Sequence, residues 1–360
     1  MWKEKLLSIF GFSMLSLMYG TSYGIAVLGL ETYPGATLIG LRMIFAVLSS
    51  GIICLFRIIA QPKIRLDIRE SVKFHKIDML KSAFGGIMYY GFPHSLIGVA
   101  QRAIPSNTVH IAQSCVPFFA FIFANFMLAD EKFSCKRFYP QLLALIGTVL
   151  TTIPTKDTST TQPPVAQDYI FLVVAIASFG FGSVYMKSGL GSAEPTICGL
   201  FQLIGSAIYS VSFALAYDRP AAIKESLEKT TWVTIAWPFI LGAVHTCGCA
   251  YCYLWTCKRL GAVVASFSNF GQIVVGVLIG IFFFDEWGKY KKNDFIMSGC
   301  GLFILMIAII CGFLDDIRPG KKDESTVSLI SENASLTNDS SNREGIADYD
   351  RPVNNKPLLA

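Results

Sequence analysis

Charged residues are scarce in this sequence. They make up 15% of the 360 residues, against roughly 25% in a typical soluble domain. Hydrophobic residues make up 53%, and the mean hydropathy is +0.51. This composition excludes an ordinary soluble protein. The apolar residues form runs, separated by short charged loops, that can each supply the ~20 helical residues needed to cross a bilayer. The sequence therefore predicts an all-α membrane protein with many spans.

Catalytic motifs are also missing. The chain has no His-Glu-x-x-His, no phosphate-binding Walker loop and no Gly-x-Ser-x-Gly. No stretch combines the clustered basic and aromatic residues of a nucleic-acid binder, and the ten cysteines fall mostly inside apolar runs. His245, Cys249 and Cys252 share one helical face, but no other span offers matching metal ligands, so a packing face of small residues is the favoured interpretation. We expect no enzyme activity, no cofactor, no bound metal and no nucleic-acid partner.

Ten apolar windows are predicted to be spanning helices, because lipid offers no partner for free backbone groups. The windows are 6–30, 35–58, 82–101, 107–129, 139–154, 169–190, 196–217, 232–256, 261–284 and 295–314.

The placement of Lys and Arg predicts the orientation. An N-terminus on the inside puts 18 of these cations on the cytoplasmic side and 8 on the other, with Arg42 and three distal ones left out. Both termini are therefore expected in the cytoplasm, and a plasma membrane and an internal membrane both fit. Residues 315–360 hold 6 basic and 9 acidic residues with many Ser and Asn, which predicts a disordered cytoplasmic tail.

An internal repeat runs through the apolar part of the chain. The fourth span ends in Phe126-Met-Leu-Ala-Asp-Glu131, and the ninth ends in Phe282-Phe-Phe-Asp-Glu286. The period is about 155–160 residues and contains five spans, an odd number that turns the second copy upside down in the membrane. The sequence thus divides into a first repeat at 6–154, a loop at 155–168 and a second repeat at 169–314. Inverted repeats that meet at the membrane midplane are typical of secondary transporters.

These features resemble the drug/metabolite transporter superfamily, in the form with two EamA-type domains of five helices. The matching residues are Pro34 and Arg42 in the second span, Pro117 in the fourth, and the acidic helix ends at Asp130-Glu131 and Asp285-Glu286. The resemblance covers residues 6–314 and leaves out the tail. It implies that helices 1–4 and 6–9 surround a central cavity that opens alternately to the two sides. One departure is Gln272, which stands in the ninth span where the family usually has proline.

Polar groups inside spans are costly, so each is a candidate for solute binding. Arg42, His94 and His245 lie within spans, whereas no Asp or Glu lies near the middle of one. This inventory favours an anionic or zwitterionic solute. For each candidate the alternative role is an interhelical hydrogen bond. The candidate binding residues are Arg42, His94, Gln113, Gln202, His245, Asn269 and Gln272; the expected packing and gating positions are Gly20, Gly24, Pro117, Gly276 and Gly280.

The predicted function is secondary transport of a small polar metabolite by alternating access. A nucleotide-sugar or organic-phosphate exchanger of an internal membrane is one alternative. A channel is another, and a non-transporting scaffold or receptor that acts through the acidic tail is a third. The expected partners are a small-molecule solute and membrane lipid. A homodimer and a monomer are both compatible with the sequence.

Overall fold

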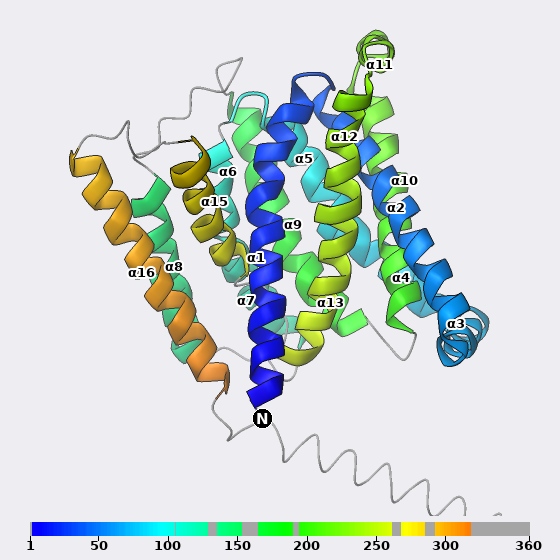
Figure 1. Cartoon of the computed structure of the whole chain (residues 1–360), viewed down its shortest axis with the longest axis horizontal. Helices are drawn as coiled ribbons and strands as arrows, with labels where there is room; N and C mark the ends of the chain where they lie inside the picture. Colours follow the sequence, from blue (N-terminus) through cyan, green and yellow to red (C-terminus); the bar gives the residue numbers. More distant parts are fainter. Residues whose placement is uncertain are drawn as a thin grey trace, which may run out of the picture. The chain divides into compact units, whose positions relative to one another are not determined.

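The computed structural model describes residues 2–104, 106–128, 135–152, 165–189, 194–260, 268–284 and 292–317. Within these ranges the regular structure is entirely helical (Figure 1), which confirms the predicted all-α class. The acidic helix ends at Asp130-Glu131 and Asp285-Glu286 lie outside the described residues. So do most of the predicted loop at 155–168 and the tail from residue 318 onward.

The first half of the chain contains a series of helices, one of them a short π-helix. They are α1 (Trp2–Leu30), α2 (Gly35–Ala60), α3 (Pro62–Phe74), α4 (Lys76–Gly86), η1 (Ile87–Gly91), α5 (Phe92–Ala100), α6 (Ser106–Gln113), α7 (Val116–Met127) and α8 (Cys135–Thr152).

The second half has a similar series, again with one π-helical segment. Its elements are α9 (Ala166–Gly189), α10 (Pro195–Tyr217), α11 (Pro220–Glu228), α12 (Trp232–Ile240), η2 (Leu241–Gly248), α13 (Cys249–Leu260), α15 (Ser268–Phe284) and α16 (Lys292–Ile317).

Six described segments are long and apolar enough to cross a membrane. They make the chain an integral membrane protein, as predicted from composition. The other four windows also contain helices, but within the described residues these do not qualify as spanning segments by length and hydropathy. The count of ten spans therefore stays a prediction. The six segments are Ile9–Leu30, Gly35–Ala60, Thr108–Met127, Ala166–Met186, Pro195–Tyr217 and Trp232–Tyr253.

Two segments that were expected to be loops form helices instead. The stretch after α2 contains α3, and the stretch after α10 contains α11. In α3 the apolar residues Ile64 and Ile68 recur at helical spacing and pack inward, while its basic residues stay exposed. An amphipathic helix of this kind is too short and too polar to register as a span, yet it buries one apolar face.

Several predicted spans depart from a regular α-helix. The window at 82–101 contains the end of α4, then η1 and α5, and the window at 232–256 contains α12, η2 and most of α13. The fourth span breaks between α6 and α7, where Pro117 lies buried in the first turn of α7. Proline lacks the N–H that a continuous helix needs, and therefore favours a helix start at this position.

Close backbone packing joins α2 and α10 to their neighbours. A Cβ atom on Gly86, at the end of α4, would overlap the carbonyl oxygen of Gln202 in α10. A Cβ on Gly242 in η2 would overlap the carbonyl oxygen of Arg42 in α2. Only glycine permits this approach, so each crossing depends on one residue without a side chain.

Polar groups tie α2 to α10 at both ends of their shared contact. Oδ2 of Asp218, just after α10, accepts hydrogen bonds from the backbone N–H and the hydroxyl of Thr37, both at 2.7 Å. At the other end, Arg57 donates to the hydroxyl of Thr196 and lies 3.7 Å from the carboxylate of Glu194. Glu194 also accepts the Thr196 N–H at 2.6 Å, which caps α10.

The other glycines expected to pack closely differ among themselves. A Cβ on Gly20 of α1 would lie 2.7 Å from the Gln272 carbonyl oxygen, so α1 and α15 touch there. Cβ atoms on Gly24 or Gly276 would meet no described atom within 4 Å, so the expected close packing is not found at these two positions. Gly280 lies in α15, and its surroundings fall outside what is described.

Alanine at Gly86 or Gly242 tests the two backbone crossings. We expect each substitution to destabilise the chain by at least the ~1–3 kcal/mol typical of overpacking, because the backbones on both sides cannot yield as a flexible side chain would. The measurement is the thermal unfolding midpoint of the purified protein in detergent. Gly51→Ala in α2 is the matched control, since a Cβ there meets no described atom within 4 Å. Equal midpoints for all three variants would contradict the packing argument.

Candidate functional site

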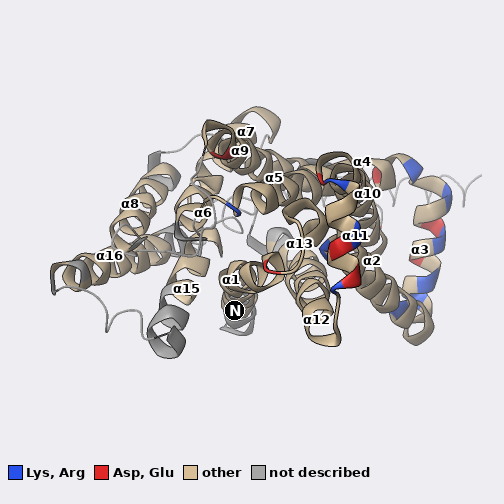
Figure 2. Cartoon of the chain, turned by 90° about the horizontal axis from the view of Figure 1, so that it is seen from above, with Lys and Arg blue, Asp and Glu red and all other residues tan. Residues whose placement is uncertain are grey.

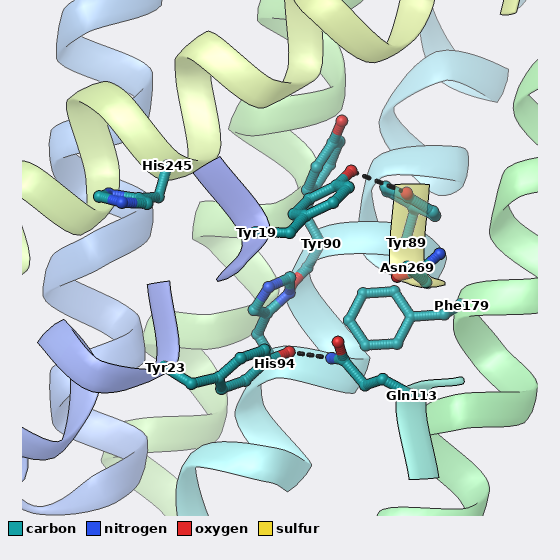
Figure 3. Close-up of a pocket in the computed structure, with 9 residues that line it drawn as sticks. All are labelled: Tyr19, Tyr23, Tyr89, Tyr90, His94, Gln113, Phe179, His245 and Asn269. Atoms are coloured by element: carbon teal, nitrogen blue, oxygen red, sulfur yellow. Dashed lines mark hydrogen bonds between the residues drawn. The ribbon is translucent and has the colours of Figure 1, made fainter. Parts of the chain in front are cut away.

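A small cavity lies among helices from both halves of the chain (Figure 3). Its open volume is about 20 Å³, which is room for little more than one water molecule. The first half contributes side chains from α1, η1, α5 and α6, and the second half from α9, η2 and α15. The lining residues are Tyr19, Tyr23, Tyr89, Tyr90, His94, Gln113, Phe179, His245 and Asn269.

Aromatic rings form one wall of the cavity. The ring of Tyr89 lies edge-on to Tyr90 at a centroid distance of 4.8 Å and to Phe179 at 5.5 Å. Its hydroxyl is 3.0 Å from the hydroxyl of Tyr19 in α1. These contacts join a π-helical turn of the first half to a spanning helix of the second. Tyrosine suits this place, because its ring packs in an apolar interior while its hydroxyl keeps a polar partner.

His94 lies on the same side of the cavity, in α5. Its Nδ1 is 2.8 Å from the carbonyl oxygen of Tyr90, one helical turn earlier. A carbonyl only accepts, so Nδ1 carries a proton and donates it. The ring also lies edge-on to Phe179 at 5.1 Å. The imidazole is thus held in one orientation by its own helix turn and by an aromatic neighbour.

His245 joins η2 to α1. Its Nε2 lies 2.8 Å from the hydroxyl of Thr21, and its Nδ1 is 3.2 Å from the carbonyl oxygen of Ile240. The carbonyl is five residues back, as the π-helical turn requires. The next residue, Thr246, uses the same spacing to bond the Leu241 carbonyl oxygen at 2.9 Å. The wide turn therefore sets the position of His245 beside the cavity.

A chain of amides links three helices beside the cavity. Nε2 of Gln272 in α15 donates to Oε1 of Gln113 in α6 at 2.8 Å. The amide nitrogen of Gln113 in turn donates to the hydroxyl of Tyr23 in α1. Asn269, three residues before Gln272, contributes to the cavity lining. Gln272 thus supplies an interhelical hydrogen bond at the position where the resembling family usually has proline.

Arg42 and Gln202 are buried but do not line the cavity. Nε of Arg42 donates to the Thr246 hydroxyl at 2.7 Å, and the side chain is 3% exposed. Its guanidinium lies close enough to Tyr19 and Tyr23 to interact with them electrostatically. Gln202 is fully buried, and neither atom of its amide finds a hydrogen-bond partner among the described residues. Arg42 is therefore connected to the cavity only through its charge beside two lining tyrosines, and Gln202 has no described connection to the cavity.

Of the seven candidate residues, four line the cavity and a fifth adjoins it through an amide. The aromatic wall was missed, because a tyrosine in an apolar run is indistinguishable from a core residue by hydropathy. One signal was present in the sequence: Tyr19 and Tyr23 are four residues apart, and so share one face of α1. The four lining candidates are His94, Gln113, His245 and Asn269.

Within the part of the chain that the structure describes, no group of three or more His, Cys, Asp or Glu side chains could hold a metal ion. Cys249 is buried, and the thiol of Cys252 bonds the Gly11 carbonyl oxygen at 3.4 Å. Both cysteines lie in α13, and the Cys252 contact joins that helix to α1.

A double-mutant cycle on Gln113 and Gln272 tests the amide chain. We expect Gln113→Leu and Gln272→Leu each to destabilise the chain and to show a coupling free energy of about 0.5–1.7 kcal/mol, the range for hydrogen bonds between membrane helices. The measurement is the free energy of unfolding in detergent for both single variants and the double variant. Additive effects of the two substitutions would contradict a direct bond between these side chains.

Part of the chain matches a known protein family. Residues 6–153 match the model of the EamA-like transporter family, so the resemblance found in the sequence is confirmed over this range. A membrane transporter is what this family implies. No curated protein matches the chain.

Solved structures share the fold. A crystal structure superposes with a TM-score of 0.60 at 13% sequence identity, over 86% of this chain and 98% of its own. At this identity the match speaks for the fold alone. The aligned share of this chain is much larger than residues 6–153, so the common fold also includes helices of the second half.

Proposed function

We propose that this chain, which carries an EamA-like transporter domain over residues 6–153, is a ten-helix secondary transporter. In this proposal it moves a small polar metabolite, anionic or zwitterionic, by alternating access between two inverted halves. The distribution of Lys and Arg supports an orientation with both termini in the cytoplasm.

The main support is a rule that the helix contacts obey. Each span of one repeat has an equivalent five spans away in the other repeat. Where two spans are in extensive contact, their two equivalents are in contact as well. The contact of α1 with α15 becomes that of α9 with α7, and the contact of α2 with η2 becomes that of α10 with α4. An inverted repeat requires this equivalence, whereas unrelated helices have no reason to follow it.

Individual residues obey the same rule at the repeat period of roughly 155–160 residues. Gly242 abuts the Arg42 carbonyl, and Gly86 abuts the carbonyl of Gln202, the partner of Arg42 in the repeat. The fifth and tenth spans meet at Gly147 and Gly301: a Cβ on either one would lie within 3 Å of the other's carbonyl oxygen.

A second pair of contacts extends the rule to the first and sixth spans. A Cβ on Gly20 would lie 2.9 Å from Cβ of Val275, and one on Gly180 would lie 2.7 Å from the backbone nitrogen of Ala120. Gly180 is the repeat equivalent of Gly20, and Ala120 is the repeat equivalent of Val275, so the two contacts are equivalent.

The size of the cavity supports a mechanism with moving helices. Ligand sites usually offer about 300–1,000 Å³, whereas this cavity offers about 20 Å³. A metabolite enters only when the helices separate. The cavity is lined from both halves, so a movement of one half against the other would open it. Alternating access is rocking of this kind around a fixed site.

The charges around the cavity support an anionic or zwitterionic solute. None of the nine lining residues is Asp or Glu. The guanidinium of Arg42 interacts electrostatically with Tyr19 and Tyr23, which line the cavity. Arginine has five N–H donors, and its described side-chain hydrogen bond uses only the one on Nε. In a low-dielectric interior an acidic group on the solute is attracted more strongly than it would be in water.

Counterflow into proteoliposomes tests the proposal. Purified protein is reconstituted with one unlabelled solute inside and the same labelled solute outside. The panel covers dicarboxylates, amino acids, organic phosphates and nucleotide sugars. We expect saturable, transient accumulation of at least one anionic or zwitterionic solute. Uptake that never exceeds equilibration would indicate a channel, and no uptake of any solute would contradict a carrier.

Arg42→Gln tests the electrostatic part. This variant keeps side-chain N–H donors at the position but removes the charge. We expect counterflow of anionic solutes to fall by about tenfold or more, which corresponds to ~1.4 kcal/mol, and Arg42→Lys to retain part of it. Gly51→Ala in the same helix is the control. Unchanged transport of every anion by Arg42→Gln would overturn the assignment of an anionic solute.

A further inference from the structure

The helix α3 lies across the end of the α2–α10 pair. In Figure 1 it is seen end-on, and in Figure 2 along its length, so it runs across the direction of the spanning helices. Ile64 and Ile68 pack in one apolar cluster with residues of α2 and α10. The Ser71 hydroxyl accepts the backbone N–H of Glu194, just before α10, at 2.9 Å. The helix is thus fixed to both of its neighbours.

The outer surface of this region carries large apolar side chains. Leu66 and Phe74 of α3 are 61% and 68% exposed, and Ile77 and Leu80 of α4 are 69% and 72% exposed. The end of α2 has the same character, with Ile59 at 74%. Such exposure is unfavourable in water. The same side chains are stable where a membrane helix contacts lipid. The exposed apolar surface of α2 continues along the chain into α3.

Basic residues are interspersed with these apolar residues along α3, where the ribbon in Figure 2 carries several blue segments. Residues 61–81 hold six basic and three acidic side chains, a net charge of +3. Within the described residues none of the six cations forms an ion pair. The cations are Lys63, Arg65, Arg69, Lys73, Lys76 and Lys81, and the acids are Asp67, Glu70 and Asp78.

We propose that α3 and the first turns of α4 form a docking surface for anionic phospholipid. Leu66, Phe74 and Leu80 would enter the interfacial layer while the cations contact lipid phosphates. An amphipathic helix with basic residues beside large apolar ones binds anionic membrane surfaces in this way. Charge complementarity and the continuity with the lipid-facing surface of α2 both favour lipid over a protein partner. The proposal does not depend on the transported solute.

Binding here would act on the centre of the molecule. α3 is attached to α2 and α10, the helices that carry Arg42 and Gln202. A lipid held on α3 therefore stabilises the arrangement of this pair. The same surface could also attract the seven acidic side chains within residues 318–360, a segment that holds six basic ones as well, and the experiment is designed to separate the two occupants.

The test is the thermal unfolding midpoint of the full-length protein in detergent with added phospholipid. We expect phosphatidylglycerol to raise the midpoint more than phosphatidylcholine does. The variant R65Q/R69Q/K73Q should lose this difference and keep its midpoint without lipid, because all three side chains are exposed. The control R219Q/K224Q/K229Q removes the same charge around α11, away from α3, and should keep the wild-type response.

Three results would overturn the proposal. The first is equal stabilisation by the two lipids. The second is an equal loss of the response in the α3 and α11 variants, which indicates a general charge effect. The third is a response that appears only in a chain ended at Ile317, which means that the acidic tail occupies this surface. A wild-type response in the shortened chain supports lipid as the occupant.

Discussion

The close crossings of α2 and α10 with neighbouring helices are the constraint on which the rest of the structure depends. Gly86 and Gly242 let backbones meet where any side chain would hold them apart. Each of these glycines lies at or beside a π-helical segment, and those segments carry Tyr89, Tyr90 and His245 to the cavity. In lipid no water is available to satisfy displaced backbone groups, so the wide turns are tolerable only because packed neighbours cover them.

Much of the architecture was readable from hydropathy, because lipid selects long apolar helices. The burial of Arg42, His94 and Gln113 was equally foreseeable, since polar groups in spans must face protein. The aromatic wall was not foreseeable, because Tyr89 and Phe179 gain their role from each other's position and hydropathy ignores pairs. The π-helical turns could not be predicted from hydropathy either, because they arise from tertiary packing. The helical pattern of α3 was present in the sequence, but a search for spans passes over a helix of 13 residues.

Gln272 illustrates how one substitution changes the physical means of holding a helix. A proline would remove a backbone donor and bend the span. The glutamine instead donates to Gln113 and so connects α15 to α6, and through the Gln113 amide to Tyr23 of α1. These two hydrogen bonds close one side of a cavity that is too small for a metabolite. In the proposed cycle, opening must break or stretch the amide chain, which makes these weak interhelical bonds suitable as a gate.

The central claim is that one cavity, shared by two inverted halves, opens to each side of the membrane in turn. The most direct measurement is the reactivity of Asn269→Cys toward a membrane-impermeant thiol reagent applied from one side of proteoliposomes at a time, with the same chain without the substitution as the reference. The account predicts reaction from either side, with protection by a transported solute on both. Reaction from neither side, or reaction accompanied by free leakage of the reagent across the membrane, would contradict it.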